Sequence, residues 1–119
     1  MALLLTHRVD QGVRLINLDS GKTLDVIVKS IDRKSDKVRL VLKEPENPDY
    51  YRVELINGTQ LKDFHYFPGL NIGIGYDGLR SSRVGLIYEL NPSIDAIRAN
   101  YSPNNDFLGY DAIKSSPRR

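Results

Sequence analysis

Cysteine and tryptophan are both absent from this chain of 119 residues. The absence of cysteine excludes disulfides, thiolate zinc sites and cysteine nucleophiles, and it favours a reducing, cytoplasmic location. Long apolar runs are missing too, because Leu3–Leu5 and Val84–Tyr88 are far shorter than the ~20 residues of a membrane-spanning helix. The start, Met1-Ala2-Leu3, has neither the basic n-region nor the cleavage site of a signal peptide. We therefore expect a cytoplasmic protein with no membrane partner.

A large excess of charge of either sign is also missing. The 17 Lys and Arg residues stand against 15 Asp and Glu residues, which gives a formal net charge of +2. Proteins that bind nucleic acid by bulk electrostatics are usually more basic than this. Any RNA site must therefore be local and made by a few arginines and backbone groups. A surface of mixed, solvated charges explains the net charge equally well.

Patterns that would indicate an enzyme are scarce. The two histidines, His7 and His65, lack spaced carboxylate partners that would make a metal site. The run Gly73–Gly78 matches GxGxxG, but a dinucleotide site needs a helix that begins inside the loop, and Arg83–Leu90 has the pattern of a strand. No nucleophile, base and orienting group stand out as a set. We predict a protein without catalysis, cofactor or metal.

What the chain does have is the two-residue periodicity of half-buried strands. Apolar residues alternate through runs that contain Leu24, Val26 and Val28, and then Val38, Leu40 and Leu42. Between the runs lie turn signals rich in Gly, Asn and Asp, which tolerate positive φ. They are Asp19-Ser20-Gly21, Lys34-Ser35-Asp36, Asn57-Gly58 and Asp77-Gly78. The pattern predicts a small all-β fold, an antiparallel sheet or barrel, with short connections.

An internal repeat is visible when the sequence is shifted by 46 positions without gaps. The shift places Leu24, Val26 and Val28 on Leu70, Ile72 and Ile74, Val38 and Leu40 on Val84 and Leu86, and Asp49 and Arg52 on Asp95 and Arg98. Two interpretations are open, since unrelated β meanders also share apolar alternation, whereas shared Asp and Arg positions favour duplication. A duplication would divide the chain into a unit at 1–56 and a diverged unit at 49–99, with strand 50–55 serving both.

The last twenty residues, 100–119, differ in character and are predicted to be a tail. Residues 101–105 have a loop-like composition, and 115–119 have that of a frayed end. Between them, Asp106–Lys114 is predicted either to form a short helix capped by Asp106 or Asn105 or to stay irregular.

Three segments carry a resemblance to a known family. Residues 3–11 read Leu-Leu-Leu-Thr-His-Arg-Val-Asp-Gln, residues 37–42 read Lys-Val-Arg-Leu-Val-Leu, and Pro45 is followed seven positions later by Arg52. In this order they resemble the carbon storage regulators, whose first strand typically reads Leu-Ile-Leu-Thr-Arg-Arg-Val-Gly-Glu. The resemblance covers roughly residues 3–56. This chain departs from the family at His7, where the family has arginine, and at Asp10, where it has glycine. It also continues as Asn57-Gly58 and further strands where the family ends in a helix.

The resemblance implies a post-transcriptional regulator that binds GGA-containing hairpin loops of messenger RNA and represses translation by occluding the ribosome-binding site. By the same resemblance, Arg52 would be the main reader of guanine, and Arg8 and Thr6 would contact phosphates and sugars. Leu5 would add backbone and apolar contacts, and Tyr51 would stack on a base.

If the duplication is real, Arg98 is the second copy of the Arg52 position. The strand around Thr6–Val9 would then pair with the strand around Ile94–Arg98, and one RNA site would consist of Thr6, His7, Arg8 and Arg98. The protein would be a homodimer or a single-chain pseudo-dimer.

An alternative interpretation keeps the fold and removes the RNA. The chain would then be a protein–protein interaction or structural module, for instance in a mobile element. His7, Asp10 and the low net charge favour this alternative.

Overall fold

The computed structural model describes residues 2–35, 37–57, 65–67, 72–80 and 82–114, and these ranges form ten strands and no helix. The strands of the first half are β1 (Ala2–His7), β2 (Gln11–Asn17), β3 (Thr23–Asp32), β4 (Lys37–Glu44) and β5 (Asn47–Asn57). Those of the second half are β6 (His65–Phe67), β7 (Ile72–Arg80), β8 (Arg83–Leu90), β9 (Ile94–Tyr101) and β10 (Phe107–Lys114). The all-β class that the alternation predicted is confirmed.

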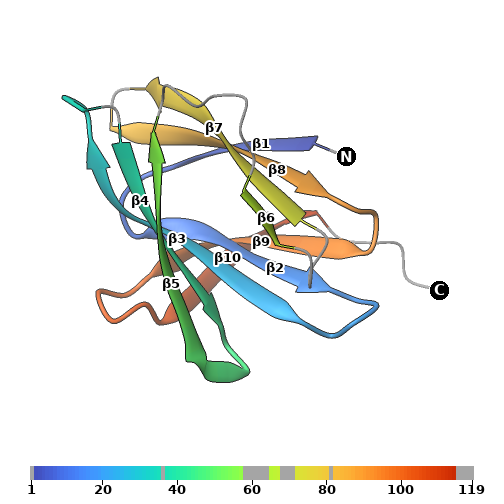
Figure 1. The fold of residues 1–119 in the computed structure, drawn as a ribbon. Coiled ribbons are helices and arrows are strands. Elements are labelled where there is room, and N and C mark those ends of the chain that lie inside the picture. The colour runs from blue at the N-terminus through green and yellow to red at the C-terminus, as the bar shows by residue number, and fades with distance from the viewer. Residues whose placement is uncertain (1, 36, 58–64, 68–71, 81, 115–119) are drawn as a thin grey trace.

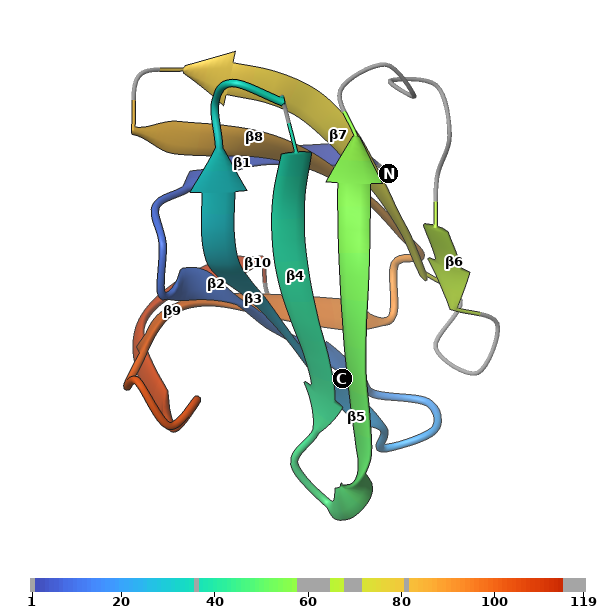
Figure 2. The same ribbon diagram turned by 60° about the vertical axis from the view of Figure 1, so that its left-hand side comes forward.

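The strands form two antiparallel sheets that face each other (Figure 1). One sheet has the order β1-β8-β7-β6, and the other has the order β10-β9-β2-β3-β4-β5. The N-terminal strand β1 therefore lies beside β8, away from β2, as Figure 2 also shows. After β8 the chain crosses to the other sheet, where β9 pairs with β2.

The core between the two sheets is made of the apolar residues that alternate along the strands in the sequence. Val26, Leu40 and Leu15 come from one sheet, and Leu86 and Ile74 come from the other; all five are almost fully buried. Successive side chains of a strand point to opposite faces, so every second residue of these strands faces the opposing sheet. This core joins both halves of the chain in one hydrophobic cluster.

A smaller apolar cluster lies on the other face of the six-stranded sheet. It contains Ile27, Val41, Ala99 and Tyr101, and Phe107 at the start of β10 packs against it. The hairpin of β9 and β10 thus covers a face that would otherwise be open to water.

Two local predictions are corrected by the strands. The segment Asp106–Lys114, predicted to be helical or irregular, forms the edge strand β10, because Phe107 has an apolar cluster to pack on. The signal Asp77-Gly78 is not a turn between strands but a bulge inside β7, and Gly78 supplies the positive φ of 105° there. The turn signals at residues 19–21 and 34–35 do connect strands.

The predicted pairing of Thr6–Val9 with Ile94–Arg98 is wrong as a strand pairing. In the structure β1 pairs with β8, in a register that places His7 opposite Val84. The backbone groups of β9 are taken by β2 on one side and by β10 on the other. The two segments still meet through the side chain of Arg98.

Candidate nucleic-acid interface

The end of β1 meets β9 through one hydrogen bond. Nη1 of Arg98 donates to the backbone carbonyl of Thr6 over 3.0 Å, across 92 positions of sequence. Thr6 and Arg98 are both half-buried, whereas Leu5 before them is buried in the core and anchors the strand. Of the predicted RNA-binding residues, the structure thus brings Thr6 and Arg98 into direct contact.

His7 is fully buried beneath this contact. Its Nε2 shares a hydrogen bond of 2.8 Å with the hydroxyl of Tyr88, and the two rings meet edge to face. Burial, and to a smaller extent the charge of Arg98, lowers the pKa of His7 to about 3, so the imidazole is neutral. The side chains of His7 and Leu5 therefore support the β1 backbone from inside and do not reach the surface.

Arg8 is exposed directly after His7, where the chain turns into β2. The turn is held by the Arg8 amide, which donates to Oε1 of Gln11 over 2.9 Å, and by Asp10 at a φ of 64°. Asp is one of the few side chains that tolerate this left-handed conformation. The carboxylate of Asp10 also forms an ion pair of 2.6 Å with Lys29.

Basic side chains gather at this end of the molecule. The register of β1 on β8 brings Arg8 to the turn between β7 and β8, and the turn between β3 and β4 lies at the same end (Figure 1). The basic end consists of Arg8, Lys29, Arg33, Lys34, Lys37, Arg39, Arg83 and Arg98, with Asp10, Asp32 and Asp77 as its acidic members. The remaining described part of the sandwich has fewer cations than anions: Arg14, Lys22 and Lys43 against Asp19, Asp25, Glu44, Glu46, Glu89, Asp95 and Asp106. The small net charge therefore conceals a segregation of charge.

The other predicted residues lie elsewhere in the fold. The backbones of Tyr51 and Arg52 belong to β5, opposite Lys43 and Leu42 of β4. Their side chains lie outside what the structure describes. Arg52 and Arg98 are in the same sheet, but on strands at different places in it.

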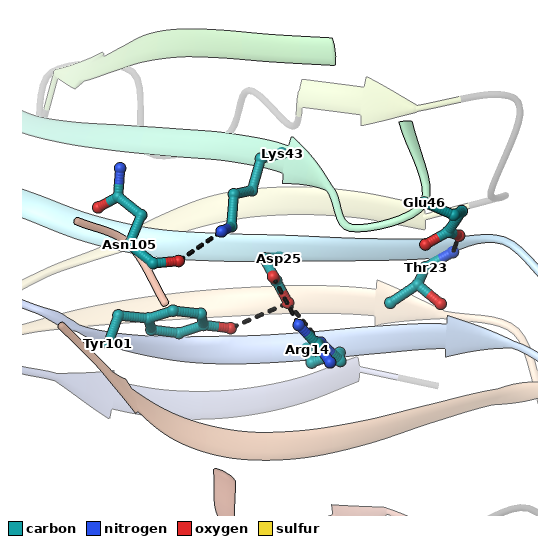
Figure 3. Close-up of polar contacts among 7 residues, drawn as sticks. All are labelled: Arg14, Thr23, Asp25, Lys43, Glu46, Tyr101 and Asn105. Atoms are coloured by element: carbon teal, nitrogen blue, oxygen red, sulfur yellow. Dashed lines mark hydrogen bonds and ion pairs between the residues drawn. The ribbon is translucent and has the colours of Figure 1, made fainter. Parts of the chain in front are cut away.

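A buried polar cluster, which the sequence did not indicate, joins Arg14 of β2 and Asp25 of β3 to Tyr101 of β9 (Figure 3). Asp25 is fully buried and accepts two hydrogen bonds from Arg14, of 2.8 and 3.0 Å, and one of 3.1 Å from the hydroxyl of Tyr101. Burial, together with the charge of Asp25, raises the pKa of Tyr101, so its hydroxyl stays protonated. The guanidinium of Arg14 also lies 3.7 Å from the centre of the Phe107 ring.

The contacts of this cluster link neighbouring strands and indicate a structural role. A carboxylate with both oxygens bonded to a planar guanidinium is a stable, satisfied arrangement. Nζ of Lys43 donates to the backbone carbonyl of Asn105, which attaches the hairpin loop to β4 (Figure 3). The one signal in the sequence was an acidic residue, Asp25, inside the otherwise apolar run Leu24–Val28.

The fold and the site together define a class: a two-sheet β protein with a basic end. Comparison of the chain with protein-family models, with curated proteins and with solved structures finds no match. Among the residues that the structure describes, no cluster of His, Asp or Glu could hold a metal ion. The same residues include no helix of the length and apolarity needed to cross a membrane.

Proposed function

We propose that the protein binds single-stranded RNA at the end of β1 and acts as a translational regulator that covers GGA-containing hairpin loops. The observation that carries the proposal is the hydrogen bond from Arg98 to the carbonyl of Thr6. It holds a half-buried guanidinium against the strand that ends before the exposed Arg8, as expected for the RNA site that a duplication would build with Arg98.

A strand edge with an arginine is suited to unpaired bases. At the edge of a sheet, every second residue turns its N–H and C=O away from the neighbouring strand. Thr6 is such a residue, because its carbonyl accepts from Arg98 of the other sheet and β1 is the last strand of its own. Loop bases expose their hydrogen-bonding edges, which backbone groups can read. The planar guanidinium of Arg98 has five donors and uses one of them on Thr6, so it can also bond guanine or phosphate.

The charge of the basic end favours an anionic ligand over a neutral one. A local excess of Lys and Arg attracts phosphates even when the whole protein is nearly neutral. Arg8 follows β1, Arg83 precedes the Val84 that pairs with His7, and Arg98 contacts Thr6. Asp10 forms its ion pair with Lys29. We assign the main reading role to Arg98, because its guanidinium has a defined position beside β1.

The test is a titration of the protein with a short RNA hairpin that has GGA in its loop, alongside a hairpin with CCA instead. We expect binding of the GGA loop to be at least about tenfold tighter, the order of one arginine–guanine contact. Arg98→Gln should lose about the same factor. Lys22→Gln, an exposed cation in the turn between β2 and β3 at the opposite end, is the matched control and should bind normally.

Salt provides a second readout. The logarithm of the affinity should fall with the logarithm of salt concentration, with a slope of about −0.7 for each phosphate neutralised. Failure to bind the GGA loop at low salt, or equal binding of both loops, would reject the proposal.

A second candidate function is a protein-binding module without RNA. The buried His7 and the Asp10–Lys29 ion pair favour it, because both reduce the positive charge that β1 offers to RNA. The ratio of absorbance at 260 and 280 nm of the purified protein separates the two functions. Copurified nucleic acid raises the ratio, whereas a module without RNA leaves it at the value of a protein with tyrosine and no tryptophan.

A further inference from the structure

Two hairpins of the fold share an irregularity at the same place. In the β3–β4 hairpin, a bulge in β3 faces Arg39 and Leu40 of β4. In the β7–β8 hairpin, a bulge in β7 faces Gly85 and Leu86 of β8. These positions of β4 and β8 differ by the 46 residues of the sequence repeat. A bulge is a specific feature of a strand, so its recurrence supports duplication more strongly than apolar alternation does.

The strand register also changes the number of positions by which the two halves are related. The β3–β4 turn lies between Asp32 and Lys37, whereas the β7–β8 turn lies between Arg80 and Arg83 and is two residues shorter. The shift is therefore 46 for β4 and β8 but 48 for β3 and β7. With this correction Leu24, Val26 and Val28 correspond to Ile72, Ile74 and Tyr76, and all six are buried in the core.

The two halves also exchange strands. β1 precedes the β2–β4 meander but pairs with β8 in the sheet of the second half. β9 follows β8 but pairs with β2 in the sheet of the first half. Each half thus completes the sheet of the other, which is the arrangement of a strand-exchanged dimer, here within one chain.

The exchange creates the contact between Thr6 and Arg98, because β1 comes from one half and β9 from the other. A symmetric dimer would contain this contact twice. In this chain the counterpart of Arg98, at the shift of 46, is Arg52 on β5. The counterpart of β1 is also β5, since Leu4 faces Ile87 of β8 as Val53 faces Val41 of β4. Strand β5 would therefore have to replace both β9, which carries the arginine, and β1, which the arginine contacts. A single strand cannot do both, so the second site is not formed.

We infer that the protein is a monomeric pseudo-dimer with a single site for a GGA loop, so that one chain binds one RNA loop. This inference rests on the proposed function for the identity of the ligand. A symmetric dimer with two such sites can bridge two loops of one transcript. This protein would cover each loop independently.

The experiment is native mass spectrometry of the full chain, alone and with the GGA hairpin in excess. We expect one chain of 13.5 kDa without RNA and a complex of one chain with one RNA. An RNA with two GGA hairpins should bind two chains, with equal and independent affinities. In a matched titration, Arg98→Gln should lose about tenfold in affinity. Arg52→Gln should stay within about twofold of the parent, because Arg52 belongs to no complete site.

The outcomes separate this inference from the proposed function. A stable homodimer, two RNA loops on one chain, or equal losses from Arg52→Gln and Arg98→Gln would overturn the single site while leaving RNA binding intact. No binding of any GGA loop would overturn both. A monomer that binds one loop through Arg98 alone supports both.

Discussion

His7 is the residue whose burial has the clearest energetic consequence. Its imidazole is neutral in the folded protein because burial lowers its pKa to about 3. In the unfolded chain the pKa returns to about 6.5. Between these two values the unfolded chain binds a proton that the folded protein does not. The contribution of His7 to stability is therefore fully present above pH ~6.5 and falls by about 1.4 kcal/mol per pH unit between that pH and the folded pKa of about 3.

This pH dependence is testable by urea denaturation. We expect the free energy of unfolding to fall by about 2 kcal/mol between pH 7 and pH 5 because of His7 alone. The double variant His7→Phe, Tyr88→Phe removes the titrating group and its hydrogen-bond partner, and it should show a smaller fall. The two proteins have the same carboxylate residues, so the difference between their pH profiles reports on His7. Equal pH dependence in the two would contradict the buried, neutral state of His7.

At the scale of single elements, β10 pairs with β9 and is packed onto the sheet face by the ring of its first residue. Its first residue, Phe107, meets Tyr101 edge to face at a ring distance of 5.9 Å and lies on the guanidinium of Arg14. The next residue, Leu108, points to solvent, with 57% of its surface exposed. Strand β10 is held at the edge of the sheet by β9 on one side only. Among the β10 side chains that the structure describes, Phe107 is therefore the one that attaches the strand to the sheet face.

Substitution at Phe107 should loosen β10 without unfolding the core. Because the ring is half-buried, we expect Phe107→Ala to cost about 1–2 kcal/mol. Hydrogen exchange should accelerate in β10 and less in β3 and β4. Leu108→Ala is the matched control, and its cost should stay within about 0.5 kcal/mol. Similar effects of the two variants would show that Phe107 does not anchor the strand.

At the scale of the whole molecule, the core and the strand exchange join both halves of the chain. The main hydrophobic cluster includes residues from both sheets, and each half contributes a strand to the sheet of the other. Neither half can therefore lose its structure without exposing the apolar face of the other. The fold predicts one cooperative unfolding transition, although the sequence contains a repeat.

A core substitution in the second half should destabilise the first half equally. Leu86→Ala, at a fully buried position of β8, is expected to cost about 2–5 kcal/mol. Circular dichroism and tyrosine fluorescence should report the same single midpoint, lowered from that of the parent protein. Leu4→Ala, on the exposed side of β1 with 51% of its surface accessible, should have little effect. Two separate transitions would indicate two independent units instead.

Most strands could be predicted from the sequence, because a half-buried strand requires apolar residues at every second position. The strand Arg83–Leu90 was predicted with the bounds that β8 has. Asp106–Lys114 was not recognised as β10, since part of the apolar cluster on which Phe107 packs, Ile27 of β3 and Val41 of β4, is distant in sequence. Asp77-Gly78 was placed in a turn because the same positive φ serves a turn and a bulge.

The sequence by itself determined the all-β class, the alternation of the core and the two arginines related by the repeat. Only the tertiary structure decided that β1 joins β8 and β9 joins β2, because strand partners depend on which edges meet in space and not on local pattern. The same decision buried His7, which the sequence placed on the binding surface, and brought Arg98 to the carbonyl of Thr6. The exchange of strands thus placed Arg98, and not Arg52, at the end of β1.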